Sequence, residues 1–398
     1  MERTKRKKEV ADIFSEYGSA YQRDHQLTFH AQRVIRSIVA CRTSALGGHV
    51  DSCDHCDYER PFYNSCRNRH CPKCGALARE RWLLSRKKLI LPVTYFHVVF
   101  TVPDTLNPVF LTNKKVMYSL LFRAGSETLL ELGKDPKHLG ADIGLLATLH
   151  TWGQNLMDHP HLHCIVTGGG LSQDRSKWVR TRQISEERDF FIHVNVLSDL
   201  FKKKFIAYMN EAYESGTLRL TGEMEYLCSR TEYKQFKNAL YGKKWNTYCK
   251  APFRGAETVL EYLGRYVYRV ALSNNRITDV RDGLVTFKWK DYRDNKMKQM
   301  TLEVFEFIRR FLLHILPGGF FKIRYYGILA SRNLKTKLKR CREVLEVFES
   351  TDPKDTRGIP WQELFLAVTG MDLRICPVCK TGRMVPKILI PNFNHSPP

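Results

Sequence analysis

The chain has few acidic side chains for its basic content and no long uninterrupted apolar run. Its 398 residues include 41 Asp and Glu against 64 Lys and Arg, which gives a formal net charge of +23. The longest apolar stretch, from about Leu89 to Val102, is broken by Pro92 and His97, and no apolar segment follows Met1. Neither a membrane span nor a secretory signal is therefore predicted. We expect a cytoplasmic protein with no membrane partner.

Three other patterns are missing. The sequence contains no Walker-type phosphate loop, so an ATP-driven motor of its own is not expected. It contains no internal repeat and no sustained heptads, which argues against a solenoid or a coiled coil. Helical patterns instead alternate with short antiparallel hairpin patterns, which favours an α+β fold.

The basic residues occur in short clusters along the chain. They are found at 5–8, 86–88, 202–204 and 335–342. Any single cluster could be an ordinary solvated surface, but the total excess suits a polyanionic partner. Nucleic acid is the expected partner.

Twelve cysteines in a reducing compartment indicate metal binding rather than disulfides. Two Cys-x-x-Cys pairs, formed by Cys53, Cys56, Cys71 and Cys74, have the spacing of two knuckles that bind one tetrahedral zinc ion. Four protein ligands would leave no open position on the metal, so this zinc is expected to be structural.

A second zinc site is a further possibility. Its candidate ligands are Cys66 and His70 within the same stretch, together with a third knuckle formed by Cys376 and Cys379. Three other residues compete as ligands: His49, His55 and Cys41.

The segment from Asp158 to Val166 contains His161 and His163, which flank one apolar residue in a β-favouring run. Side chains alternate along a strand, so both imidazoles would lie on one face. A pair of ordinary satisfied histidines is the alternative. Later in the chain, Tyr262 and Tyr266 lie four residues apart in a helical pattern, so both phenols would project from one helix face.

These residues resemble the HUH endonucleases, and among them the two-tyrosine transposases of the insertion sequence 91 type. The likeness also includes Cys53 to Cys74, Tyr95 to Pro103 and Glu306 to Phe311, and it covers most of the chain. It implies an HUH-type antiparallel sheet with flanking helices and a small N-terminal zinc-binding module.

The resemblance further implies nicking and rejoining of single-stranded DNA at mobile-element ends and targets by rolling-circle transposition. Tyr262 and Tyr266 would be the nucleophiles and would form 5'-phosphotyrosine. Because the chain has no motor, strand separation would come from a host helicase or the replication machinery. The location would then be bacterial and nucleoid-associated.

The catalytic metal needs a third ligand beside His161 and His163. The resemblance favours Gln154, which a hairpin turned at Asn155 to Pro160 would bring across from the histidines; His159 is the rival. Two imidazoles and an oxygen ligand suit Mg²⁺ or Mn²⁺.

Three regions are expected: a helical and zinc-binding domain at 1–90, a catalytic domain at 91–330, and a basic C-terminal segment with a Cys-x-x-Cys knuckle at 331–398. Seven basic residues are candidates for DNA binding: Arg265, Arg269, Lys202, Lys203, Lys204, Arg309 and Arg310.

Other functions fit part of the pattern. A plasmid replication initiator or relaxase would use the same chemistry, although the zinc module and the lack of a helicase segment argue against it. A tyrosine recombinase would work without metal and form a 3'-phosphotyrosine. A zinc-stabilised DNA-binding regulator would use the histidines and tyrosines only for packing.

Overall fold

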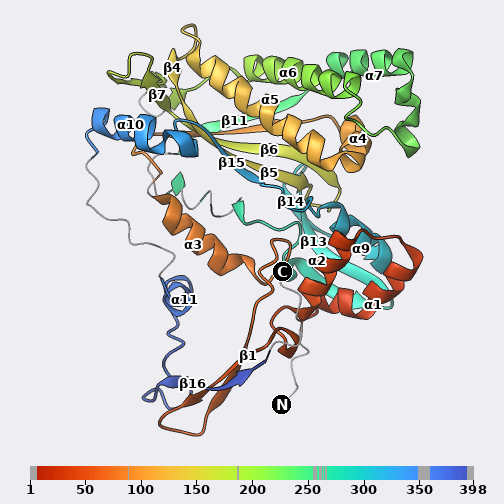
Figure 1. Cartoon of the computed structure of the whole chain (residues 1–398), viewed down its shortest axis with the longest axis vertical. Helices are drawn as coiled ribbons and strands as arrows, with labels where there is room; N and C mark the ends of the chain where they lie inside the picture. The colour runs from red at the N-terminus through yellow and green to blue at the C-terminus, as the bar shows by residue number, and fades with distance from the viewer. Residues whose placement is uncertain are drawn as a thin grey trace.

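The computed structural model describes residues 7–87, 89–185, 188–253, 258, 259, 262, 264, 267–347 and 359–391. Helices and antiparallel sheets are mixed along the chain, which confirms the α+β class (Figure 1). The helices are α1 (Val10–Asp24), α2 (Phe29–Ala40), α3 (Gly75–Lys87), α4 (Asn107–Thr112), α5 (Lys114–Lys134), α6 (Val194–Glu214), α7 (Arg230–Gly242), α9 (Val304–Leu313), α10 (Lys339–Val344) and α11 (Trp361–Thr369).

The central sheet has five strands in the order β11-β3-β6-β5-β15, and all neighbouring strands are antiparallel. These strands are β3 (Tyr95–Thr101), β5 (Gly144–Trp152), β6 (Asp158–Thr167), β11 (Asn246–Phe253) and β15 (Ile323–Gly327). The middle strand β6 carries the two histidines of the His-x-His motif and forms a hairpin with β5. The connection lies at residues 153–157, earlier than the turn expected at 155–160, because residues 158–160 already belong to β6. The motif therefore lies in the middle of a rigid sheet.

The two faces of this sheet have different covers. Phe100, Leu149 and Leu162 alternate onto one face and pack in a large core with α5 and α6, the two long helices that lie above the sheet in Figure 1. Gly125 lets α5 approach closely, because a Cβ there would lie 2.8 Å from a methyl group of Leu162. The histidines alternate onto the other face, which α3 approaches.

A second core joins segments that are distant in sequence. Helices α1 and α2 pack against α9 and a three-stranded sheet of β12 (Ile277–Arg281), β13 (Leu284–Asp291) and β14 (Lys296–Glu303). The ring of Phe14 in α1 meets that of Phe311 in α9 edge to face, with centroids 5.2 Å apart. This packing links the first forty residues to the region after residue 270.

Two strands from distant parts of the sequence also pair. Strand β16 (Met384–Ile390) pairs with β1 (Gly48–Cys53), which pairs in turn with β2 (Glu59–Tyr63), at the bottom of Figure 1. These contacts cross the boundaries expected at residues 90 and 330, and the three-region division stays a prediction.

The smaller strands are β4 (Ala141–Asp142), β7 (Gly169–Ser172), β8 (Trp178–Arg180), β9 (Arg182–Ser185) and β10 (Arg188–Phe190). Strands β4, β7 and β8 form a three-stranded sheet, and β9 and β10 form a two-stranded one. Within the described ranges, no helix combines the length and the apolar character needed to cross a bilayer.

Candidate active site

Three histidines meet on the face of the central sheet that lies opposite α5 and α6. His150 in β5 lies directly opposite His161 in β6, and His163 follows two residues later on the same face. One ring nitrogen from each of the three comes within 4.8 Å of the others. His150 and His163 are buried, and their ring centroids are 4.5 Å apart. Strand register thus creates a three-imidazole site.

Hydrogen bonds orient two of these rings. Nδ1 of His161 lies 2.6 Å from the carbonyl oxygen of His159, and Nδ1 of His163 lies 2.8 Å from Nε2 of His97. A carbonyl only accepts, so His161 donates its Nδ1–H there and its Nε2 lone pair is left for another partner. Such contacts behind the ligating nitrogen are typical of metal-binding histidines.

Burial keeps His161 and His163 uncharged. Loss of solvent lowers the pKa of His161 to about 4, with a further contribution from His159. Burial, followed by the neighbouring His150, holds the pKa of His163 well below its ordinary value. Neutral imidazole is the form that binds a metal ion, so His161 and His163 are in the ligand state at neutral pH.

The structure places the expected third ligands elsewhere. The side-chain amide of Gln154 donates to the exposed Tyr292 hydroxyl at 3.2 Å, and its backbone carbonyl accepts from Arg276. The register shifts between His150 and Trp152, so Gln154 lies beyond the regular pairing of β5 with β6. His159 contributes its carbonyl to His161 and is not in the three-nitrogen cluster. The third member of the cluster is His150, which was not among the expected ligands; the register shift between His150 and Trp152 means that regular counting from the turn would not place it opposite His161.

Tyr262 reaches the cluster through His97. Its hydroxyl lies 2.7 Å from Nδ1 of His97, and the same imidazole contacts His163. The described residues 258, 259, 262, 264 and 267 have helical backbone, and this segment packs against α3. A Cβ at Gly264 would lie 2.9 Å from the Leu83 side chain, so glycine permits this close approach. Tyr266 lies outside the described residues.

A basic pocket adjoins the histidines. It is lined in part by Arg69, His70, Trp152, Arg269 and Lys322, and the Trp152 ring stacks on His150 with centroids 4.7 Å apart. Burial, and then Arg69, lowers the pKa of Lys322 to about 8. Burial, and then Lys322, lowers the pKa of His70 to about 3. His70 therefore belongs to this pocket and not to a cysteine cluster.

The cysteines form two groups of four. Cys41, Cys66, Cys71 and Cys74 are one group, and Cys53, Cys56, Cys376 and Cys379 are the other; the sulfurs of each group lie within 4.8 Å of one another. The expected single site of Cys53, Cys56, Cys71 and Cys74 is not formed, and neither is the site of Cys66, His70, Cys376 and Cys379. Strand pairing of β1 with β16 brings Cys53 to the C-terminal knuckle. Cys41, which follows α2, contributes the fourth sulfur to the other group, and its Sγ lies 3.2 Å from the Sγ of Cys74.

The donor atoms of these clusters fit metal ions. Groups of four thiols suit tetrahedral zinc. Three imidazoles without a carboxylate suit Mn²⁺ better than Mg²⁺, which prefers oxygen ligands.

Comparisons with known proteins show which family the chain resembles. A family model described as "Putative transposase" matches residues 144–337, and one described as "Transposase zinc-binding domain" matches residues 13–102. "Putative transposase y4qJ" of Sinorhizobium fredii is 46% identical over 95% of this chain and 94% of its own. The transposase for insertion sequence element IS801 of Pseudomonas savastanoi pv. phaseolicola is 26% identical over 88% of this chain and 82% of its own. No solved structure matches.

The chain belongs to the IS91 family of transposases. The N-terminal zinc-binding module is that of the family, and the first cysteine group lies within its matched range. A transposase acts on DNA at the ends of its element, which accounts for the net charge of +23.

The expected DNA-binding residues of this IS91-family transposase lie in different surroundings. Arg269 lines the pocket beside the histidines. Lys202, Lys203 and Lys204 lie on α6, which covers the opposite face of the sheet, and Lys204 pairs with Glu131 at 2.7 Å. Arg265 lies outside the described residues.

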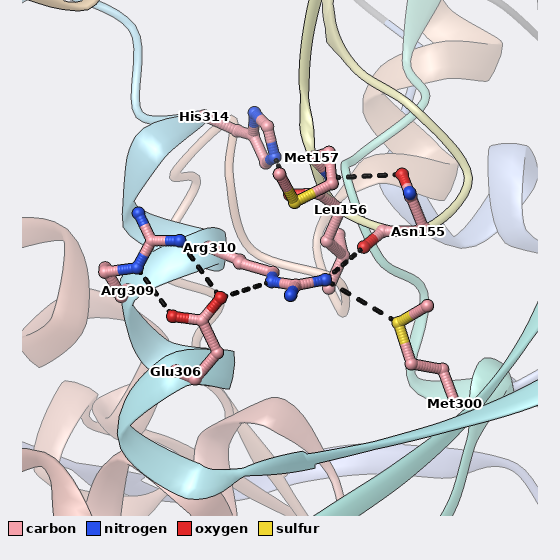
Figure 2. Close-up of polar contacts among 8 residues, drawn as sticks. All are labelled: Asn155, Leu156, Met157, Met300, Glu306, Arg309, Arg310 and His314. Carbon is pink, nitrogen blue, oxygen red and sulfur yellow. Dashed lines mark hydrogen bonds and ion pairs between the residues drawn. The ribbon is translucent and has the colours of Figure 1, made fainter.

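Helix α9 carries the last two candidates, Arg309 and Arg310, beside the β5–β6 turn (Figure 2). Glu306 forms ion pairs of 2.6 Å with Arg309 and with Arg310. Arg310 also donates to the carbonyl oxygen of Asn155 at 3.2 Å, and His314 contacts that of Leu156 at 3.0 Å. Arg310 therefore fixes the turn that precedes the histidine strand.

Proposed function

We propose that this transposase nicks and rejoins single-stranded DNA at the ends of its mobile element through attack by Tyr262 on a phosphodiester. The observation that carries the proposal is the continuous contact from the Tyr262 hydroxyl through His97 to His163 of the three-histidine cluster. A phenol beside a buried cluster of metal-ligating type is suited to nucleophilic catalysis.

The proposed step balances without an added energy source. The phenol oxygen of Tyr262 bonds to phosphorus, the bond from phosphorus to the 3'-oxygen breaks, and the phenol proton ends on the released 3'-hydroxyl. The 5'-phosphate stays on the tyrosine, so a 3'-hydroxyl can later reverse the step and join strands without ATP. This agrees with the lack of a phosphate loop in the sequence.

The histidine contacts set the direction of hydrogen bonding. If His163 binds a metal ion through Nε2, its proton is on Nδ1 and is donated to Nε2 of His97. His97 then has its own proton on Nδ1, which it donates to the Tyr262 oxygen. A donated hydrogen bond favours the phenolate, which is the nucleophilic form. His97 thereby serves both the nucleophile and the ligand.

His150, His161 and His163 would hold a divalent metal ion, for which Mn²⁺ or Mg²⁺ are the candidates, and it would polarise the scissile phosphate as a Lewis acid. Arg269 and Lys322, in the pocket beside Trp152, would bind the phosphates of the incoming strand. Single-stranded DNA at the element's ends and at the target is the proposed substrate.

Cys41, Cys66, Cys71 and Cys74 would bind the structural zinc of the N-terminal module. Cys74 directly precedes α3, and α3 packs against the segment of Tyr262. Zinc at this site would therefore fix the helix that supports the nucleophile.

The family's rolling-circle route needs two cleavages, for which Tyr266 is proposed as the second nucleophile. Strand separation would be supplied by a host helicase or the replication machinery, and the working location would be the bacterial nucleoid. A replication initiator would share the cleavage step. Labelled element ends joined into a new target would support transposition, whereas repeated nicking at one plasmid origin would support the initiator.

The deciding experiment uses labelled single-stranded DNA from the element's ends, with and without Mn²⁺ or Mg²⁺, resolved on a denaturing protein gel. We expect a metal-dependent covalent adduct, weakened in Tyr262→Phe and abolished in the double variant with Tyr266→Phe. An adduct of full intensity in Tyr262→Phe would reassign the nucleophile. DNA binding without any adduct would favour the zinc-stabilised binding protein.

A further inference from the structure

The C-terminal knuckle completes a four-sulfur cluster with the N-terminal module. The sulfur of Cys53 lies 3.7 Å from that of Cys379, and the sulfur of Cys56 lies 3.7 Å from that of Cys376. All four sulfurs lie within 4.8 Å of one another. Only Cys53 and Cys56 lie in the range that the zinc-binding family model matches, residues 13–102.

The local backbone has the form of two facing metal knuckles. The backbone N–H of His55 donates to the sulfur of Cys53, and that of Gly382 donates to the sulfur of Cys379, both at 3.3 Å. Such bonds stabilise thiolates. Gly382 lies so close to Cys53 that a Cβ would collide with its sulfur. Glycine is therefore required for the two knuckles to meet.

The surrounding contacts hold the knuckles together. Strand β16, which follows the C-terminal knuckle, pairs antiparallel with β1, and Cys53 is the partner of Met384. Asp54 accepts a hydrogen bond of 2.7 Å from the backbone N–H of Arg383. Four sulfurs converging from distant parts of the chain are explained by a shared ligand that prefers thiolates.

We propose that Cys53, Cys56, Cys376 and Cys379 bind a second zinc ion, which joins the C-terminal arm of the chain to the N-terminal module. A metal ion that closes so long a loop removes much of the freedom of the unfolded chain, so it contributes strongly to folding of both ends. The site is structural, because four thiolates leave no open position.

The C-terminal segment also contacts α3, the helix that packs against the Tyr262 segment. Trp361 at the start of α11 meets Phe62 of β2 edge to face, with centroids 5.8 Å apart, and Arg81 of α3 donates to the carbonyl of Ile359 at 3.4 Å. Helix α11 packs against α3, which in turn packs against the Tyr262 segment. The second zinc thus holds α11 over α3. Its presence does not depend on the proposed tyrosine chemistry.

The test measures zinc stoichiometry of the full chain by native mass spectrometry. We expect two zinc ions in the wild type, and one in the variant Cys376→Ser with Cys379→Ser. The matched control replaces Cys228 and Cys249, which belong to neither cluster, and should keep two. One zinc in the wild type, or two in the Cys376 and Cys379 variant, would overturn the proposal.

A measurement on the wild type guards against misfolding of that variant. Thiol alkylation mapped by mass spectrometry should find all four cysteines protected, and a chelator should expose them together with release of zinc. Hydrogen exchange should then rise in both β1 and β16. Rapid alkylation of Cys376 and Cys379 in the zinc-loaded protein, or a disulfide among the four, would contradict a zinc site whatever the adduct assay shows.

Discussion

The hydroxyl of Tyr262 lies 2.7 Å from Nδ1 of His97, a residue 165 positions earlier in the chain. His97 is buried on β3, and its other nitrogen lies 2.8 Å from His163. One imidazole therefore connects the proposed nucleophile with the proposed metal ligands. Its position on β3, an interior strand of the central sheet, places its ring between Tyr262 and His163.

Replacing His97 by alanine removes both contacts. We expect adduct formation to slow by about 10- to 100-fold, the usual cost of losing a partner behind a metal ligand, while affinity for single-stranded DNA stays unchanged. His97→Gln should recover part of the metal affinity, since its amide can approximate the Nε2 contact to His163. Adduct rates measured at saturating Mn²⁺ remove the effect of weaker metal binding, so they report the role of His97 toward Tyr262 alone. An unchanged rate in His97→Ala would mean that the contact to Tyr262 has no catalytic value.

The choice of third ligand leads to a second prediction. His150→Ala should weaken Mn²⁺ binding by about 10- to 100-fold, because one of three nitrogens is lost. Gln154→Ala should leave Mn²⁺ affinity nearly unchanged, because its amide contacts Tyr292. Isothermal titration of both variants with Mn²⁺ compares them directly. The opposite ranking would restore Gln154 as the ligand.

The sequence predicts the local elements around the site well. Alternation of apolar and polar residues indicates β3, β5, β6, β13 and β14, and helical spacing indicates α5 and α9. The pair His161 and His163 also falls on one face, as period two requires. These features depend on neighbours in sequence, so they can be read from it.

The sequence does not predict which distant strands and which distant ligands meet. Cys53 and Cys56 could have joined any other knuckle, and only the pairing of β1 with β16 selects Cys376 and Cys379. The stretch from Tyr95 to Pro103 belongs to the family likeness, but nothing in it marks His97 as the partner of Tyr262, because the two residues meet only in the folded chain. Spacing predicts ligand types, while strand order decides which ligands meet.

Helix α9 provides a third prediction, on the turn drawn in Figure 2. Arg310→Gln removes an ion pair with Glu306 and the hydrogen bond to the Asn155 carbonyl, so we expect a loss of about 1–3 kcal/mol in the free energy of unfolding. Arg309→Gln is the matched control: its ion pair with the same carboxylate is more exposed, so its loss should be below about 1 kcal/mol. Chemical denaturation measures both.

The same pair of variants separates structure from DNA binding. If Arg310 acts mainly on the turn, DNA affinity of the folded Arg310→Gln protein should match that of Arg309→Gln at equal salt. A much larger loss of affinity, with a shallower salt dependence, would instead assign Arg310 to a phosphate contact.

Asp158, the first residue of β6, gives a pH-dependent prediction. Its side chain is buried, and neither carboxylate oxygen has a hydrogen-bond partner in the described part of the chain. Burial raises the pKa of this carboxyl to about 7, opposed in part by the nearby Lys114 ammonium. In the unfolded chain the pKa returns to its ordinary value near 4.

The folded protein therefore holds a proton on Asp158 between about pH 4 and pH 7 that the unfolded chain has lost, and stability falls as pH rises through this window. Asp158→Asn has no such loss. We expect it to be more stable than the wild type by about 1–3 kcal/mol at pH 8, with the difference shrinking toward pH 5. Denaturation of both proteins at the two pH values tests this. A gain that is equal at pH 5 and pH 8 would show that the carboxyl is already ionised at pH 5 in the folded state, and a loss at pH 8 would show that the charge is stabilised by Lys114.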